Sequence, residues 1–390
     1  MPSPSFADRR PFEQRSLVVG AVAGALCLVG VILNPGQFYY AYLLAFVFWL
    51  GITLGSLGLL MIQHLSGGAW GFVIRRQLEA ATRLLPLMAV LVLPVFVGMR
   101  TLYPWARDAE VIVQSKRIYL NVPFFVVRTF IYFAVWIALA RLLNRWSLEQ
   151  DERGEEPAGH RMRALSGGGL VLYIVTMTFA SIDWIMSLEP HWFSTIFSVI
   201  IIGGQGLSAL AVAIIVLAAL ANEKPLAEVA APVRFHDLGN LLLAFLMLWA
   251  YFSFSQFLII WSGNLPEEIP WYVHRTQDGW QWISIALVIF HFAVPFLLLL
   301  SRTTKRVSRT LVKVAAGILV MRMVELFWII APERPDGFHL HWLWLDLVAP
   351  IAIGGVWISL FVRALGNRAL LPRYGDEGAY AVHAHVVTDH

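Results

Sequence analysis

Residues 39–65 read YYAYLLAFVFWLGITLGSLGLLMIQHL, a run of apolar and small residues that holds no Asp, Glu, Lys or Arg. About 20 consecutive apolar residues make an α-helix that is long enough to cross the hydrocarbon core of a bilayer. The length of the run and its lack of formal charge therefore predict a membrane-spanning helix.

The composition extends this prediction to the whole chain. Of the 390 residues, 58% are hydrophobic and 14% are charged, and the mean hydropathy is +0.68. Soluble domains carry about 25% charged residues, so an ordinary soluble enzyme and a disordered chain are both excluded. The net charge of +4 is spread over 29 basic residues, which argues against nucleic acid as a partner.

Ten apolar runs have a suitable length, and turn-forming residues such as Asn34-Pro35-Gly36 and Glu189-Pro190 separate them. We predict an all-α polytopic membrane protein with about ten transmembrane helices. The predicted spans are 16–33, 39–65, 84–104, 122–143, 167–188, 194–221, 237–262, 281–301, 309–331 and 342–365. In sequence order, residues 1–15 then form an N-terminal segment, residues 16–365 form the membrane domain, and residues 366–390 form a C-terminal tail.

Basic residues indicate the orientation of these spans. The N-terminus, the even-numbered loops and the tail hold twenty Arg and Lys residues, whereas the odd-numbered loops hold five. Loops rich in Lys and Arg stay in the cytoplasm, so both termini are predicted to be cytoplasmic.

The cysteine content limits the redox chemistry of the chain. Cys27 is its one cysteine, which excludes a disulfide framework, a Cys-ligated iron–sulfur cluster and a CxxCH haem attachment. A haem between helices needs two histidines at matching depth, and the two clearly inside spans, His64 and His291, differ in depth. We therefore expect no metal site and no covalently bound cofactor.

Charged residues inside the spans mark a candidate outer site. A charge at the bilayer centre costs about 2.5–3.5 kcal/mol on insertion scales. Asp183 and Arg128 lie at similar depths, roughly 9 Å from the outer end, on neighbouring antiparallel helices, so we predict that they form a buried pair. With Glu189 and His191 they would form a catalytic outer site; the alternative is a structural ion pair.

A second polar group is predicted in the later spans. Arg322 and Glu325 share one helix face by their i,i+3 spacing, and His291 lies near mid-membrane in the preceding span. With His64 at the inner end of the second span, these residues are candidates for a proton relay. The alternatives are that Arg322 simply neutralises Glu325 and that His64 caps a helix.

The spans also show a weak internal repeat. Residues 39–188 and 194–331 each hold four spans, and the last span of each block carries an acid near its outer end, Asp183 or Glu325. The pattern predicts two parallel four-helix bundles plus flanking helices.

Several motifs resemble those of a known family. They are Ser181-Ile182-Asp183-Trp184-Ile185-Met186-Ser187-Leu188-Glu189-Pro190-His191-Trp192, Asp237-Leu238-Gly239-Asn240, the run from Trp249 to Gln256, Pro266-Glu267-Glu268-Ile269-Pro270-Trp271 and Tyr119-Leu120-Asn121-Val122-Pro123-Phe124-Phe125. Over nearly its whole length the chain resembles the ActF subunits of bacterial alternative complex III, which are similar to the ActC and NrfD/PsrC membrane subunits.

The resemblance implies a function in the respiratory chain of a bacterial inner membrane. Alternative complex III oxidises quinol and passes electrons to cytochrome c or to an oxidase. The implied partners are an ActC-like membrane subunit, a multihaem cytochrome c and iron–sulfur subunits that hold the haem and iron–sulfur centres, membrane lipids, and quinone or menaquinone. The chain would contribute a quinone-related pocket or a proton path.

Two other functions stay open at this point. The chain could be a structural scaffold that docks the redox subunits, in which case each charge inside the membrane would be paired. It could also be a stand-alone transporter, for which Gly203-Gly204 is the nearest candidate for a broken helix.

Overall fold

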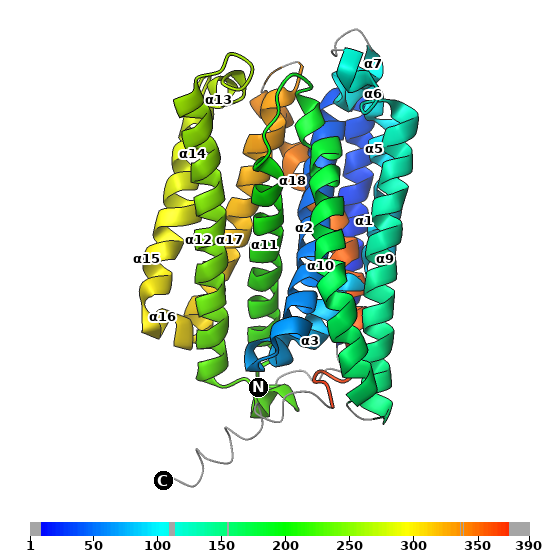
Figure 1. Ribbon diagram of the computed structural model, residues 1–390, viewed down its shortest axis with the longest axis vertical. Coiled ribbons are helices and arrows are strands. Elements are labelled where there is room, and N and C mark those ends of the chain that lie inside the picture. Colours follow the sequence, from blue (N-terminus) through cyan, green and yellow to red (C-terminus); the bar gives the residue numbers. More distant parts are fainter. Residues whose placement is uncertain (1–8, 109–113, 154–155, 336, 338, 374–390) are drawn as a thin grey trace.

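The computed structural model describes residues 9–108, 114–153, 156–335, 337 and 339–373, and these residues form helices and no strand (Figure 1). Ten helical segments are long and apolar enough to cross a membrane, which confirms the predicted number. The chain is thus a multi-pass helical membrane protein by the length and composition of its helices.

Eight of these segments are formed by a single helix or begin with one. They are α1 (Arg10–Leu33), α2 (Pro35–Ser66), α9 (Val122–Arg153), α10 (Glu156–Trp184), α11 (Phe197–Leu220), α12 (Pro232–Gly263), α17 (Ser308–Ile330) and α18 (Leu343–Gly366). The eighth segment is α14 (Trp280–Ala286), the π-helix η5 (Leu287–Ala293) and α15 (Val294–Leu300). Most bounds lie within a few residues of the prediction, although α1 begins six residues earlier and α9 ends ten residues later.

The third segment differs from the predicted span 84–104. It runs from residue 69 to residue 97 and is divided into α3 (Ala69–Thr82), α4 (Leu85–Leu91) and α5 (Leu93–Val97), and the short helices α6 (Met99–Leu102) and α7 (Pro104–Arg107) follow it. Pro86, Pro94 and Pro104 each lie at the first or second position of a new piece, because proline lacks the amide that a helix interior needs. The positive-φ residues Gly67 and Gly68 turn the chain from α2 into α3.

The helix α2 lies at the centre of the molecule. Its most apolar stretch is 94% buried, against 22% for that of α1, because α10, α11, α17 and α18 all pack on α2. On one side of α2, the helices α4 and α10 pack against both α2 and α9. On the other side, α12 and α17 pack against α11, and α15 packs against α12 and α17 (Figure 1). The flanking α1 packs on α18, where Gly20 meets Gly355 in a close crossing of small residues.

Both described termini lie at one end of the bundle. We call this the terminal end: α1 begins and α18 ends there, and α3 and α16 (Arg302–Arg306) lie there as well. The opposite end carries α7 and α13 (Pro270–His274), and we call it the α13 end (Figure 1). The tail beyond residue 373 and residues 1–8 lie outside the described residues.

Two segments that the sequence analysis treats as loops are helical. The stretch with Arg75 and Arg76 forms α3, and most of the predicted connector 144–166 extends α9 and α10. The broken helix that a transporter would favour is not found at Gly203-Gly204, because α11 runs through both glycines without interruption.

Candidate functional site

Arg128 and Asp183 form a buried pair, as predicted. Arg128 donates through Nη2 to Asp183 Oδ1 at 2.7 Å and through Nε to Oδ2 at 2.9 Å, and Tyr132 donates its hydroxyl to Oδ2 at 2.7 Å. The guanidinium also donates to the carbonyl of Tyr119 and lies 3.8 Å from the centre of that ring and 4.2 Å from that of Phe124. Asp183 is fully buried. We call these residues the Asp183 cluster.

The other two residues predicted for the outer site lie elsewhere. Glu189 interacts with Glu333 and Arg275, and His191 is exposed at the α13 end. The chain leaves α10 at Trp184 and passes through the short helix η3 (Met186–Leu188), so the residues after it no longer follow the α10 face that carries Asp183. The structure therefore divides the predicted four-residue site.

Glu325 lies at the centre of a second cluster. Arg322 donates to Glu325 Oε2, and Trp249 Nε1 donates to Oε1 at 2.8 Å. His291 Nδ1 lies 3.6 Å from Oε2, and the imidazole packs against Trp249 with 4.1 Å between the ring centres and a tilt of 35° between the ring planes. The prediction that Arg322, Glu325 and His291 come together is confirmed. We call these four residues the Glu325 cluster.

His291 has unused hydrogen-bonding capacity. Its side chain is fully buried, and neither ring nitrogen has a hydrogen-bond partner among the residues that the structure describes. Buried polar atoms are normally hydrogen-bonded, so a buried histidine with two open positions needs an explanation. His291 also lies in the π-helix η5, and π turns within α-helices occur frequently at functional sites.

The guanidinium of Arg322 packs directly against Gly204. A Cβ atom at Gly204 would lie 2.1 Å from Cζ of Arg322, whereas one at Gly203 would meet nothing closer than 3.8 Å. The absence of a side chain on this face of α11 therefore makes room for the guanidinium.

An apolar groove of about 660 Å³ reaches the Glu325 cluster. It lies among α12, α14, η5 and α17, and Trp249, Tyr272, Phe292 and Glu325 are among its lining residues. Val288, which also lines it, is 64% exposed, so the groove opens on the lipid-facing side. Ligand pockets are typically 300–1,000 Å³, mostly apolar, with a few placed polar groups.

A pair of carboxylates lies at the α13 end. Arg275 Nη2 contacts Glu333 Oε1 at 2.7 Å, and Glu189 shares a hydrogen bond with Glu333. Burial and the neighbouring Glu333 carboxylate raise the pKa of Glu189 to about 7, against the opposing charge of Arg275. We call Glu189, Arg275 and Glu333 the Glu333 cluster.

His64 does not join the predicted relay. It lies at the terminal end of α2, where it interacts with Arg75 and Glu79, and its buried Nε2 has no hydrogen-bond partner within the described part of the chain. The structure thus separates His64 from His291 and places it beside a cluster that the sequence analysis missed.

The missed cluster surrounds the carboxylate of Glu79, and we call it the Glu79 cluster. Arg75 contacts this carboxylate at 3.1 Å, Arg76 at 2.6 Å and Arg368 at 3.2 Å, and Ser147 donates to it at 2.6 Å. The spacing of Arg75, Arg76 and Glu79 by three and four residues is the signal that could have identified a shared helical face.

A cluster suited to a metal ion is not found: no group of three or more His, Cys, Asp or Glu side chains in the described ranges could hold one. Protein-family models and curated proteins were both searched, and neither gives a match to the chain.

Proposed function

We propose that the chain is an integral membrane subunit of a quinol-oxidising oxidoreductase, and that its groove takes a quinone headgroup against the Glu325 cluster. One observation carries the proposal: a groove open to the lipid side ends at a buried carboxylate beside a histidine with two unpartnered nitrogens. A lipophilic ligand with hydroxyl or carbonyl groups fits this combination of an apolar wall and polar end.

The cluster suits the protons that quinol oxidation releases. A quinol that becomes a quinone loses two electrons and two protons. Arg322 holds Glu325 close to the groove, so this carboxylate can accept one hydroxyl proton, and His291 can accept the other. A haem or iron–sulfur centre of a partner subunit would supply the oxidant for the two electrons.

The Glu333 cluster offers the next position for a released proton. Glu325 and Glu333 are eight residues apart at the end of α17 and in η6 (Ala331–Glu333), which corresponds to about 12 Å along a helix. Protons would thus leave toward the α13 end, the side opposite both termini. In the orientation that the basic residues predict, this is the outer side of a bacterial inner membrane.

The resemblance to ActF subunits supports the same assignment and supplies the proposed partners. These are an ActC-like membrane subunit, a multihaem cytochrome c and iron–sulfur subunits of an alternative complex III.

A substitution that fills the groove tests the proposal. Val288→Trp places an indole in the groove, and Val320→Trp, on α17, places one at a similarly exposed position that does not line it. Equilibrium binding of labelled benzoquinone and naphthoquinone analogues to the purified protein should weaken at least tenfold in V288W and stay unchanged in V320W. Equal binding by V288W and the unsubstituted chain, or no saturable binding at all, would contradict the proposal.

A structural scaffold is the second candidate, and the Asp183 cluster favours it. The bidentate pair and Tyr132 satisfy the Asp183 carboxylate, as the scaffold alternative predicts for charges inside the membrane. A complex that assembles normally and oxidises quinol at the usual rate with V288W would favour the scaffold over a quinone site in this chain.

A further inference from the structure

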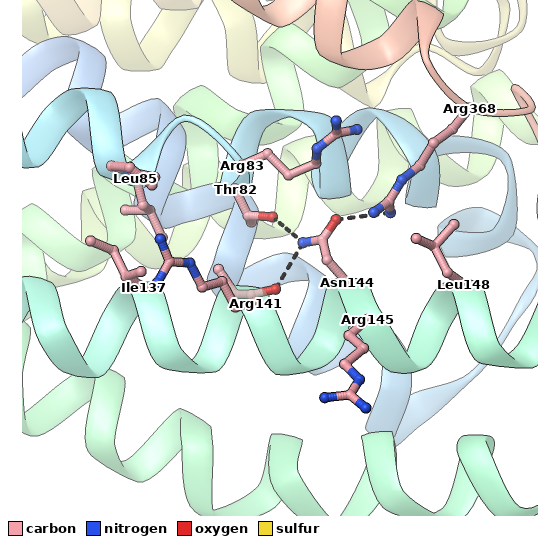
Figure 2. A pocket seen from close by; sticks show the side chains of 11 residues that line it. Thr82, Arg83, Leu85, Ile137, Arg141, Asn144, Arg145, Leu148 and Arg368 are labelled. Carbon is pink, nitrogen blue, oxygen red and sulfur yellow. Dashed lines mark hydrogen bonds between the residues drawn. The ribbon is translucent and has the colours of Figure 1, made fainter.

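A second pocket lies at the terminal end, apart from the groove. It has a volume of about 390 Å³ and is formed by α9, by the corner between α3 and α4, and by Arg368 beyond the end of α18 (Figure 2). Nothing in the proposed quinone chemistry uses it.

Arginine side chains from three separate segments gather around this pocket. Figure 2 shows Arg83, Arg141 and Arg368 on the same side of α9 as Asn144, while Arg145 points away. Arg145 pairs with Glu149 at 3.0 Å and is 75% exposed. We call the pocket the arginine pocket and assign its charge to Arg83, Arg141 and Arg368.

These three arginines carry more positive charge than nearby acids neutralise. Arg83 donates to the carbonyl of Ala364, and within the described ranges neither Arg83 nor Arg141 has a carboxylate at ion-pair distance. Arg368 contacts Glu79, but that carboxylate is shared with Arg75 and Arg76. Burial lowers the pKa of Arg368 despite the attraction of Glu79, and the charge of Arg83 acts in the same direction.

A buried amide organises the floor of the pocket. Asn144 is 5% exposed, donates to Thr82 Oγ1 at 2.9 Å and accepts from Arg368 Nη1 at 3.0 Å. Asn144 thereby holds the α3–α4 corner and the segment after α18 against α9. The arginines are therefore fixed relative to one another by the fold and not by their mutual contacts.

Most of the remaining lining is apolar, and part of it is exposed. Leu148, which is 38% exposed, is one of the apolar lining residues, which are Leu85, Pro86, Ile137, Ala140 and Leu148; Arg145 also lines the pocket. Ile137 and Arg141 are one helical turn apart on α9, so an apolar position and a charged position follow each other along one face. A ligand that fits would have an anionic head and an apolar body.

We propose that the arginine pocket binds the phosphate headgroup of an anionic phospholipid, with an acyl chain along the α9–α4 surface. Guanidinium groups match phosphate oxygens in geometry and charge, and basic pockets between transmembrane helices bind anionic headgroups. The apolar lining favours a lipid over free phosphate, which would leave the exposed side chain of Leu148 uncovered.

The test compares two variants with the same loss of charge. R83Q/R141Q removes two arginines of the pocket, and R302Q/R306Q removes two exposed arginines of α16 at the same end. The full chain is purified into nanodiscs of phosphatidylcholine with or without phosphatidylglycerol, and bound lipid is counted by native mass spectrometry. Retention of phosphatidylglycerol should fall about twenty-five-fold in R83Q/R141Q, since each arginine contributes roughly a factor of five, and stay unchanged in R302Q/R306Q.

A second arm separates a lipid from a free ion. Inorganic phosphate added to phosphatidylcholine nanodiscs should leave the thermal unfolding temperature unchanged, while phosphatidylglycerol should raise it in the unsubstituted chain. Equal stabilisation by phosphate, or equal lipid retention in both double variants, would overturn the proposal. If R83Q/R141Q does not fold, R141Q alone should lower retention about fivefold and R141K should restore it.

Discussion

The Asp183 and Glu325 clusters have the same parts but different surroundings. Each is an acid near the α13 end of a long helix, held by an arginine and by one aromatic donor, Tyr132 or Trp249. Asp183 is held at both oxygens by one guanidinium and lies among aromatic rings. Glu325 lies beside an unsatisfied histidine and lines a groove.

The comparison of the two clusters shows which features separate a structural charge inside a membrane from a candidate functional one. The cost of burial makes each such charge a candidate for function, but a fully hydrogen-bonded pair explains its own presence. An unpartnered titratable side chain, His291, and a groove that reaches the carboxylate distinguish the Glu325 cluster. The Asp183 cluster therefore fits a stabilising ion pair, and the Glu325 cluster is the candidate site of the proposed function.

Replacing the arginine of each cluster, in separate variants, should have the largest effect on stability. The size of the loss should differ between the two clusters. Arg128→Met leaves the Asp183 carboxylate buried with one donor, and breaking a buried pair in this way costs about 3–5 kcal/mol. Arg322→Met should cost less, about 1–3 kcal/mol, because Glu325 keeps the Trp249 donor and the nearby His291. Denaturant unfolding of the purified variants in micelles measures both losses. An equal loss in the two variants would show that the clusters are equally structural.

Gly204→Ala should disturb the Glu325 cluster without removing a charge. The new methyl group would overlap the Arg322 guanidinium and push it away from Glu325, at a cost of about 1–3 kcal/mol. Gly203→Ala is the matched control, since its methyl group meets only ordinary contacts. Quinone-analogue binding and unfolding should both change in G204A and neither in G203A. Identical behaviour of the two variants would argue against an Arg322 position set by Gly204.

The Glu333 cluster should give a smaller effect that depends on pH. Because the pKa of Glu189 rises from 4.5 to about 7 on folding, the folded chain binds more protons than the unfolded chain between these values. The stabilisation from this group is then present below pH 4.5 and is lost as the pH rises through 7. Glu189→Gln should therefore be more stable than the unsubstituted chain at pH 8, by at most about 1 kcal/mol, and this advantage should vanish near pH 5. If the difference in unfolding free energy between E189Q and the unsubstituted chain were the same at both pH values, Glu189 and Glu333 would not share a proton in the folded chain.

His191→Ala should have the smallest effect. His191 is exposed, and surface substitutions away from special features change stability by less than about 0.5 kcal/mol. Unfolding and quinone-analogue binding of H191A should match those of the unsubstituted chain. A loss of binding in H191A would restore His191 to the site.

Much of the fold could be predicted because the membrane restricts the choices. Spans of about 20 apolar residues must be helical, so residues 39–65 sufficed to indicate the class and the other runs gave the number of helices. The pairing of Arg128 with Asp183 could also be predicted, because helix rise converts sequence position into depth. The division of residues 39–188 and 194–331 into two four-helix bundles stays a prediction.

The rest could not be predicted because it depends on contacts between distant segments. The Glu79 carboxylate on α3 is contacted by Ser147 and Arg368. These two residues are far from α3 in the sequence, so residues 69–82 alone do not indicate the contacts. The direction of Glu189 is set by the short helix after α10 and by Arg275. The groove requires knowledge of which side chains leave space between α12 and η5.

The π-helix η5 also changes the rotational phase of its segment. Its buried positions Leu287, His291, Pro295 and Leu299 follow one another at intervals of four residues. In a regular α-helix each such interval advances by about 40°, so the last of the four would have turned roughly 120° away from the first. The wider π turn offsets this drift and keeps one stripe facing inward. Loss of a single residue from this turn would rotate the lower half of the segment as a unit and present its inner stripe to lipid.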